Sequence, residues 1–141
     1  MGPLKHLACG TILAAGIIIK DREFDTALAC VAGAVLCDTD HLLEYYKYCK
    51  DFDVKEPSFA EWKSGEYFNT KGTVYVLLHS WEVCILMWFL LLFGSENHIL
   101  KGLAIGYTSH LCLDQIGNNL NNKSYFWLYR WWHDFKQADL M

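Results

Sequence analysis

Apolar residues form long stretches along most of this chain, and short polar breaks separate them. The stretches predict four long helices and then a short aromatic segment, over residues 4–19, 24–48, 72–93, 96–117 and 124–136. Polar residues divide the first two helices at 20–23 and the other two at 94–97. We therefore expect two antiparallel hairpins, joined by the polar residues 49–71. The predicted fold is all-α: a bundle of four long helices plus a short aromatic C-terminal segment.

Length and composition agree with this fold class. A chain of 141 residues is expected to form one domain, residues 1–141, large enough to bury a core. Its two prolines and few clusters of turn residues favour helices over a many-stranded sandwich. Hydrophobic residues make up 53% of the chain and aromatic residues 16%, which exceeds an ordinary soluble domain.

Charge and cysteine content exclude several classes of protein. The formal net charge is −4 and no run of Lys or Arg occurs, so nucleic-acid binding is not expected. The six cysteines form no CxxC pair, which argues against a zinc knuckle or a disulfide framework and indicates buried thiols in a reducing compartment. No convincing cleavage site follows the N-terminal apolar stretch, so no removable signal peptide is predicted.

Membrane association is favoured, and a soluble bundle stays open as the alternative. A bilayer core needs about 20 mostly apolar residues per helix. Residues 73–93 approach this length with Glu82 as their only charge, whereas the first two helices have uncharged runs of 14 and 12 residues. The aromatic runs at residues 88–93 and 125–132 resemble an interfacial belt, although they could also cap a soluble bundle.

Five metal-ligand side chains are predicted to meet, because positions equally far from a hairpin turn lie at one height. His6 lies 16 residues before a turn near residue 22, and Asp38 lies 16 residues after it. His79 lies 16 residues before a turn near residue 95, and His110 lies 15 after it. Asp114 follows His110 by four residues and shares its helix face. Converging ligands from facing helices are how bundles build metal sites.

Further polar residues are expected to support these ligands. Asp38 and His41 are three residues apart on one face, while Asp40 points elsewhere or supports a ligand from behind. Glu82 lies one turn after His79 and is expected to partner it. Mixed imidazole and carboxylate ligation suits zinc first, with manganese or iron as alternatives.

Each of these residues, taken singly, can also be explained by a common structural role that involves no metal. A histidine at a helix start, a hydrogen-bonded His-Asp pair within one helix and a satisfied core histidine are all common, and only the joint occurrence favours a metal site. His98 and His133 fit the geometry less well, so both are expected to be structural or exposed. Asn118 follows the last ligand helix and is expected to cap it or to face the site.

The order of these motifs resembles the family of bacterial membrane-bound metal-dependent hydrolases. The matching residues are His6, Asp38-Thr39-Asp40-His41, His79-Ser80 and Ser109-His110 with Asp114. That family is in turn similar to zinc-dependent phospholipase C, an all-helical phosphodiesterase. The resemblance implies that His6, Asp38, His79, His110 and Asp114 are metal ligands, for one or two ions. It also implies a bacterial or phage-encoded protein at the inner membrane.

Two departures from the family pattern stand out. Cys37 occupies the place of a proline before the first aspartate, and Val74-Tyr75-Val76 replaces a His-Arg-Gly stretch before His79. The arginine of that stretch would be a natural phosphate contact. This chain has none there.

The expected activity is hydrolysis, of phosphoester bonds in a membrane lipid or another small amphiphilic substrate. A bound metal would activate a water, with Asp38 or Asp40 as general base. One alternative is a non-catalytic membrane-associated protein whose closed metal site only holds the bundle together. Another is an HD-type phosphohydrolase, but the only adjacent pair, His133-Asp134, lies at the end of the chain. The sequence does not indicate the oligomeric state.

Overall fold

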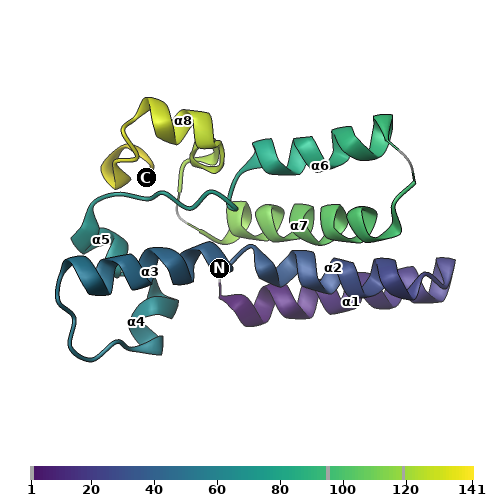
Figure 1. Ribbon diagram of the computed structural model, residues 1–141, viewed down its shortest axis with the longest axis horizontal. Helices are drawn as coiled ribbons and strands as arrows, with labels where there is room; N and C mark the ends of the chain where they lie inside the picture. The colour runs from purple at the N-terminus through teal and green to yellow at the C-terminus, as the bar shows by residue number, and fades with distance from the viewer. Residues whose placement is uncertain (1, 95, 119) are drawn as a thin grey trace.

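The computed structural model describes residues 2–94, 96–118 and 120–141. These residues form α-helices and two short 3₁₀ helices, and no strand (Figure 1). The elements are α1 Pro3–Asp21, α2 Phe24–Leu36, α3 Thr39–Asp51, α4 Phe59–Ser64, α5 Tyr67–Lys71, α6 Trp81–Phe93, α7 His98–Gly117, η1 Asn122–Tyr125, α8 Trp127–Trp132 and η2 Gln137–Asp139. The all-α prediction is confirmed.

Helices α1, α2, α6 and α7 lie side by side and form the bundle, while α3, α4, α5 and α8 extend from one end of it (Figure 1). The hairpin turn between α1 and α2 falls at Arg22, which adopts the left-handed conformation with φ 57° and caps α1. At the other turn the Asn97 side chain accepts a hydrogen bond from the Leu100 amide and caps the start of α7. The two predicted hairpins are therefore present.

Glycines allow α7 to approach α2 very closely. A Cβ atom on Gly102 would lie 2.7 Å from the Cβ atom of Ala29, and a Cβ atom on Gly106 would lie 2.7 Å from the amide nitrogen of Ala34. The carbonyl oxygen of Cys30 would be even closer to the added Cβ atom on Gly106. Small residues four apart allow this kind of backbone contact between apolar helices. The contact fixes the height of α7 against α2.

The second predicted helix, residues 24–48, is interrupted. It divides at Cys37 and Asp38 into α2 and α3, which continue in similar directions (Figure 1). The break leaves the Leu36 carbonyl free to accept a hydrogen bond from the Thr39 hydroxyl at 2.6 Å. Asp38 thus stands at a helix junction and not in the middle of a helix.

The third predicted helix, residues 72–93, was wrong over its first half, because α6 begins only at Trp81. The preceding segment, residues 73–80, is largely extended and bonds to distant side chains and backbone. Its Tyr75 and Leu78 amides donate to the carboxylates of Glu44 and Asp40, each at 2.7 Å, and its Val74 amide donates to a carbonyl near the C-terminus. Tertiary partners have replaced the bonds that a helix would make.

The polar crossover, residues 49–71, contains the two short helices α4 and α5, which the sequence did not predict. They close over α3 around a separate core whose buried members are mostly aromatic: Tyr45, Tyr48, Tyr67, Phe68 and Val76. The C-terminal aromatic segment forms η1 and α8, beside the start of α6 (Figure 1). Both regions gather at the end of the bundle where the predicted ligands lie.

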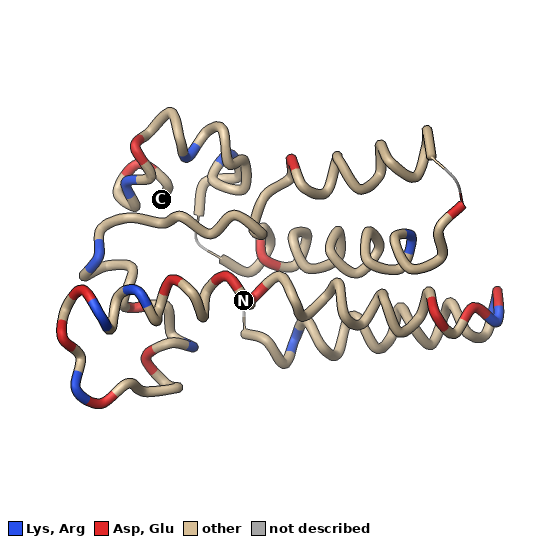
Figure 2. The backbone as a smooth tube through the Cα atoms, viewed as in Figure 1, with Lys and Arg blue, Asp and Glu red and all other residues tan. Residues whose placement is uncertain are grey.

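Apolar side chains cover much of the outside of the bundle. Helix α1 and the combined segment Phe24–Asp51 are long and apolar enough to cross a membrane. Only 17% of the apolar stretch of α1 is buried inside the protein, unlike a soluble core helix. Charged residues gather at the two ends and leave a central stretch of the four helices without charge (Figure 2). These features are consistent with membrane association.

Candidate metal centre

The structure brings all five predicted ligands together where four segments meet. His6 comes from the first turns of α1, Asp38 from the junction of α2 and α3, and His79 from the segment just before α6. His110 and Asp114 come from the last turns of α7. Four of these side chains are at most 4% exposed, and Asp38 is half-buried. A cluster of carboxylates and imidazoles is therefore withdrawn from bulk water.

Four atoms of this cluster, here called the tetrahedral set, have spacings close to those of ligand atoms around a tetrahedral metal ion. They are the Nε2 atoms of His79 and His110, Oδ1 of Asp38 and Oδ2 of Asp114. Five of the six distances among them lie between 3.1 and 3.6 Å. A tetrahedral zinc ion with bonds of about 2.0–2.1 Å holds its ligand atoms about 3.3 Å apart. These five spacings are therefore within about 0.3 Å of the spacing of ligand atoms around a zinc ion.

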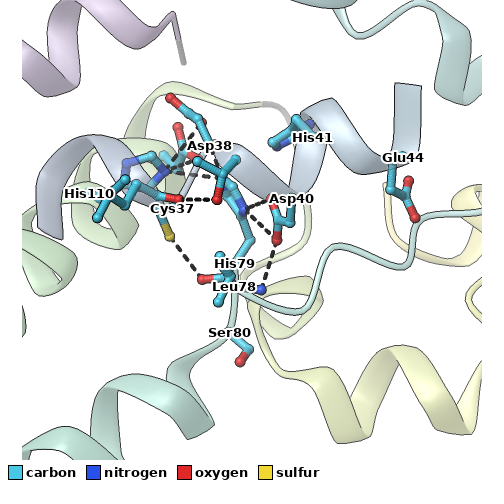
Figure 3. A network of polar contacts seen from close by, with 12 residues as sticks. Cys37, Asp38, Asp40, His41, Glu44, Leu78, His79, Ser80 and His110 are labelled. Atoms are coloured by element: carbon cyan, nitrogen blue, oxygen red, sulfur yellow. Dashed lines mark hydrogen bonds and ion pairs between the residues drawn. The ribbon is translucent and has the colours of Figure 1, made fainter. Parts of the chain in front are cut away.

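Hydrogen bonds behind the two histidines fix which nitrogen faces the centre. The Nδ1 atom of His79 lies 3.1 Å from Oδ1 of Asp40, and the Nδ1 atom of His110 lies 2.8 Å from the carbonyl oxygen of Ala34. A carboxylate and a carbonyl can only accept, so both Nδ1 atoms donate. Each Nε2 is then directed at the centre. Figure 3 shows Asp40 and Asp38 meeting His79 from the same turn of chain.

The neighbouring carboxylates also set the charge of His79. Burial lowers its pKa, but hydrogen bonds to Asp38 and Asp40 outweigh burial and raise the pKa to about 9. Without a metal, a proton on His79 Nε2 can bridge to His110 Nε2, 3.1 Å away. A cation bound between the two nitrogens would take the place of that proton.

His6 lies on the other side of Asp114. Its Nε2 is 3.1 Å from Oδ1 of Asp114, while Oδ2 of the same carboxylate faces the tetrahedral set. The approach lacks hydrogen-bond geometry, so both ring nitrogens of this fully buried histidine have no hydrogen-bond partner in the described chain. The ring stacks on His110 at 3.7 Å between centroids. His6 and Asp114 are thus candidate ligands for a second ion beside the first position.

Asp38 and Asp40 have different surroundings. One oxygen of Asp38 belongs to the tetrahedral set, and the other, Oδ2, is buried with no hydrogen-bond partner among the described residues. Both oxygens of Asp40 are engaged, by His79 Nδ1 and by the Leu78 amide. These bonds give Asp40 the role of orienting His79, while its role as general base stays a prediction. Asp38 has one oxygen without a hydrogen-bond partner among the described residues.

His41 lies closer to the centre than a supporting residue would. Its ring packs edge-on against His79 at 4.5 Å between centroids, and one of its nitrogens lies with ligand atoms of Asp38 and His79 within 4.8 Å of one another. Nδ1 is 3.3 Å from the Tyr67 hydroxyl. His41 is thus a candidate ligand on the open side of the site.

Glu82 does not partner His79, so that prediction is corrected. Its two carboxylate oxygens accept hydrogen bonds from the amides of Trp127 and Leu128, at 2.9 and 3.0 Å, and hold the first turn of α8. The first amides of a helix have no partner within the helix, which explains why Glu82 bonds to the start of α8 and not to His79. His98 and His133 lie outside the cluster as expected, each beside a single carboxylate.

Cavities adjoin the cluster. The wider one has a volume of about 250 Å³ and opens over Asp38, His41 and Asp114. Its other walls come from α1, α4, α5 and the segment after α7, at Pro3, Trp62, Lys63, Ser64, Gly65, Phe68, Asn118 and Leu120. A small molecule can therefore reach the ligand side chains. Asn118 does face the site, as the sequence allowed, while Asn119 lies outside the described residues.

The sequence analysis missed three residues that shape the site: a pair of glycines in α7 and an arginine in α8. Gly102 and Gly106 lie on the same face of α7 as His110 and Asp114, each four residues before the next, and set the close contact that lets His110 reach Ala34. Their GxxxG spacing was a readable signal. Arg130, buried in α8, had no such signal, because its position depends on the whole fold.

Comparison with protein-family models, curated proteins and solved structures gave no match. The function is therefore inferred from the geometry of the site and from the resemblance of its motifs.

Proposed function

We propose that this protein is a metal-dependent hydrolase that cleaves phosphoester bonds in a membrane lipid or another small amphiphilic molecule. The observation that carries the proposal is the convergence of His79, His110, Asp38 and Asp114, whose ligand atoms have five spacings close to those around zinc. Manganese and iron accept the same donors, and His6 provides for a second ion.

The chain's own residues suit hydrolysis. A metal bound here would supply Lewis acidity and lower the pKa of a water to about 7. Oδ2 of Asp38, which has no hydrogen-bond partner among the described residues, is the proposed acceptor for the proton that the attacking water loses. Asp40 keeps Nε2 of His79 directed at the centre throughout.

The open cavity favours catalysis over a purely structural metal. Structural zinc sites have closed coordination, whereas catalytic sites leave one position open. Here one side of the cluster borders a cavity of about 250 Å³. Its walls combine apolar side chains, such as Trp62 and Phe68, with the cation Lys63, a combination that suits an amphiphile carrying an anionic group.

We further propose that the bundle is embedded in a membrane, with the site at one surface. The uncharged stretches of the four helices are 12 to 14 residues long, roughly 20 Å, and Lys5, Lys20 and Lys101 at their edges can extend to the headgroups. Nine of the twelve Lys and Arg lie at the site end: Lys5, five in residues 37–80 and three in residues 118–141. The positive-inside rule then directs the site to the cytoplasm.

Metal analysis and an assay on the purified full chain test the hydrolase proposal. His79→Ala should lose most of the bound zinc and the hydrolysis of a chromogenic phosphodiester, because it removes one of the four ligand atoms of the tetrahedral set. His98→Ala, at the opposite end of α7, is the matched control and should change neither. Equal metal content and rate in the His79 variant would refute the proposal. Stoichiometric zinc without hydrolysis of any phosphoester would favour the structural alternative.

Membrane embedding has its own test. Membranes from cells expressing the full chain should retain it through a carbonate wash and release it with detergent. Release by carbonate alone would contradict embedding and leave the metal proposal unaffected.

A further inference from the structure

Arg130 is a buried arginine with few partners. Its side chain is 1% exposed, and its Nη2 atom donates to the carbonyl oxygen of His79 at 3.1 Å. Its Nε atom is buried and has no hydrogen-bond partner among the described residues. No carboxylate of those residues forms an ion pair with it within 4.0 Å, since Asp40 and Glu82 act on it only at longer range. A buried guanidinium without a paired anion is costly, which raises the question of what balances it.

A small cavity is lined both by Arg130 and by residues of the metal cluster. It has a volume of about 100 Å³, and its walls include Arg130, His41, His79 and Asp114. A space of this size admits a few waters or one small tetrahedral group. The remaining walls include the polar side chains Asn118, Ser124 and Gln137.

This inner cavity continues the wider one that opens beside Asp38. The two share five wall residues: His41, Phe68, Asp114, Asn118 and Leu120. The two cavities are therefore neighbours, one lined by Asp38 and Lys63 and the other by Arg130. Leu120 lies on the boundary and is only partly buried.

We propose that Arg130 binds the non-bridging oxygens of the substrate's phosphoryl group in this inner cavity. The proposal rests on the proposed function and deepens it, because it assigns the anionic end of the substrate to one place. A planar guanidinium matches two oxygens of a phosphoryl group, and the orphaned Nε offers a donor for them. The segment before His79 has no arginine in the sequence, but Arg130 reaches the backbone of His79 from α8, a distant part of the chain.

The opposing interpretation is that Arg130 only anchors the backbone at His79. That role requires only the hydrogen bond from Nη2 to the His79 carbonyl oxygen and does not depend on a bound anion. The two interpretations differ in whether phosphate affinity depends on the guanidinium and on access to the cavity.

Calorimetric titration of inorganic phosphate into the zinc-loaded full chain in detergent tests the proposal. Arg130→Lys keeps the charge but loses the paired donors, and Leu120→Trp blocks the inner cavity while leaving Arg130 in place. Both should raise the Kd for phosphate by about tenfold or more, with zinc content unchanged. Lys136→Gln, which removes an exposed cation beyond α8, is the matched control and should leave the Kd unchanged.

The outcomes separate this proposal from the proposed function. Wild-type protein that binds no phosphate, or variants with unchanged Kd, would overturn the role of Arg130 even if zinc-dependent hydrolysis is found. If the wild-type chain holds no metal, the hydrolase proposal fails, and the same titration on the metal-free chain still decides whether phosphate binding depends on Arg130. If Arg130→Lys does not fold, Leu120→Trp decides the matter.

Discussion

Replacing Gly106 by alanine tests the helix contact on which the metal centre depends. The added Cβ would lie 2.7 Å from the Ala34 amide nitrogen, and closer to the carbonyl oxygen of Cys30. Ordinary contact begins near 3.4 Å, so the nitrogen alone requires α7 to retreat from α2 by about 0.7 Å, and the nearer carbonyl oxygen requires more. Both obstructing groups are backbone atoms of α2, which cannot rotate away as a side chain would.

The expected cost follows from two opposing effects. Overpacking of this kind costs about 1–3 kcal/mol, and a clash with backbone belongs at the upper end. Alanine regains about 1 kcal/mol of helix propensity over glycine. We therefore expect Gly106→Ala to lower the free energy of unfolding by about 2 kcal/mol. The same retreat lengthens the 2.8 Å bond from His110 to Ala34, so zinc affinity should fall as well.

Gly16→Ala is the matched control. Gly16 also lies inside a helix, but a Cβ atom there meets nothing within 4 Å. This variant should be more stable than wild type by about 0.5–1 kcal/mol and bind zinc equally. Denaturant unfolding in detergent, followed by circular dichroism, measures stability, and competition with a chromogenic chelator measures zinc affinity. If Gly106→Ala matched Gly16→Ala in both, the close α2–α7 contact would be refuted.

Three further predictions concern polar residues. Asp40→Asn should weaken zinc binding about 10–100-fold, measured by chelator competition, because the carboxylate that orients His79 is lost; unchanged affinity would exclude that role. Glu82→Ala should cost about 1 kcal/mol in denaturant unfolding, because it frees the amides of Trp127 and Leu128, yet leave zinc content unchanged; zinc loss would revive a direct role at the site. Hydrogen bonds to the Glu23 carboxylate, above all the one from the Thr26 hydroxyl, lower the pKa of Glu23 to about 2. The ionised carboxylate therefore stabilises the fold above its usual pKa of 4.5, and this stabilisation is lost as the pH falls toward 2. Thermal unfolding should therefore show wild type above Glu23→Gln at pH 7, with the difference closing by pH 2, and a constant difference would contradict this.

The helices and the height of the ligands could be predicted because they depend on local spacing. Apolar runs and polar breaks predicted the two hairpins, and equal distances from the first turn placed His6 and Asp38 at the same end of the bundle. The i, i+4 spacing of His110 and Asp114 set their shared face without reference to the rest of the chain. His79 also reached the cluster, although it lies outside a helix, because it directly precedes α6.

The features that could not be predicted from the sequence depend on hydrogen-bond partners that lie far away along the chain. Residues 73–80 have an apolar pattern compatible with a helix, but the carboxylates of Asp40 and Glu44 take up their amides only once α3 packs beside them. Glu82 lies one helical turn from His79, yet α8 presents two free amides to it. Arg130 meets the site only through the return of the C-terminal segment. Local spacing determines helices and the faces of helices, whereas the choice of hydrogen-bond partner for a buried polar group is made by the tertiary fold, because an unpaired group is costly and distant groups compete for it.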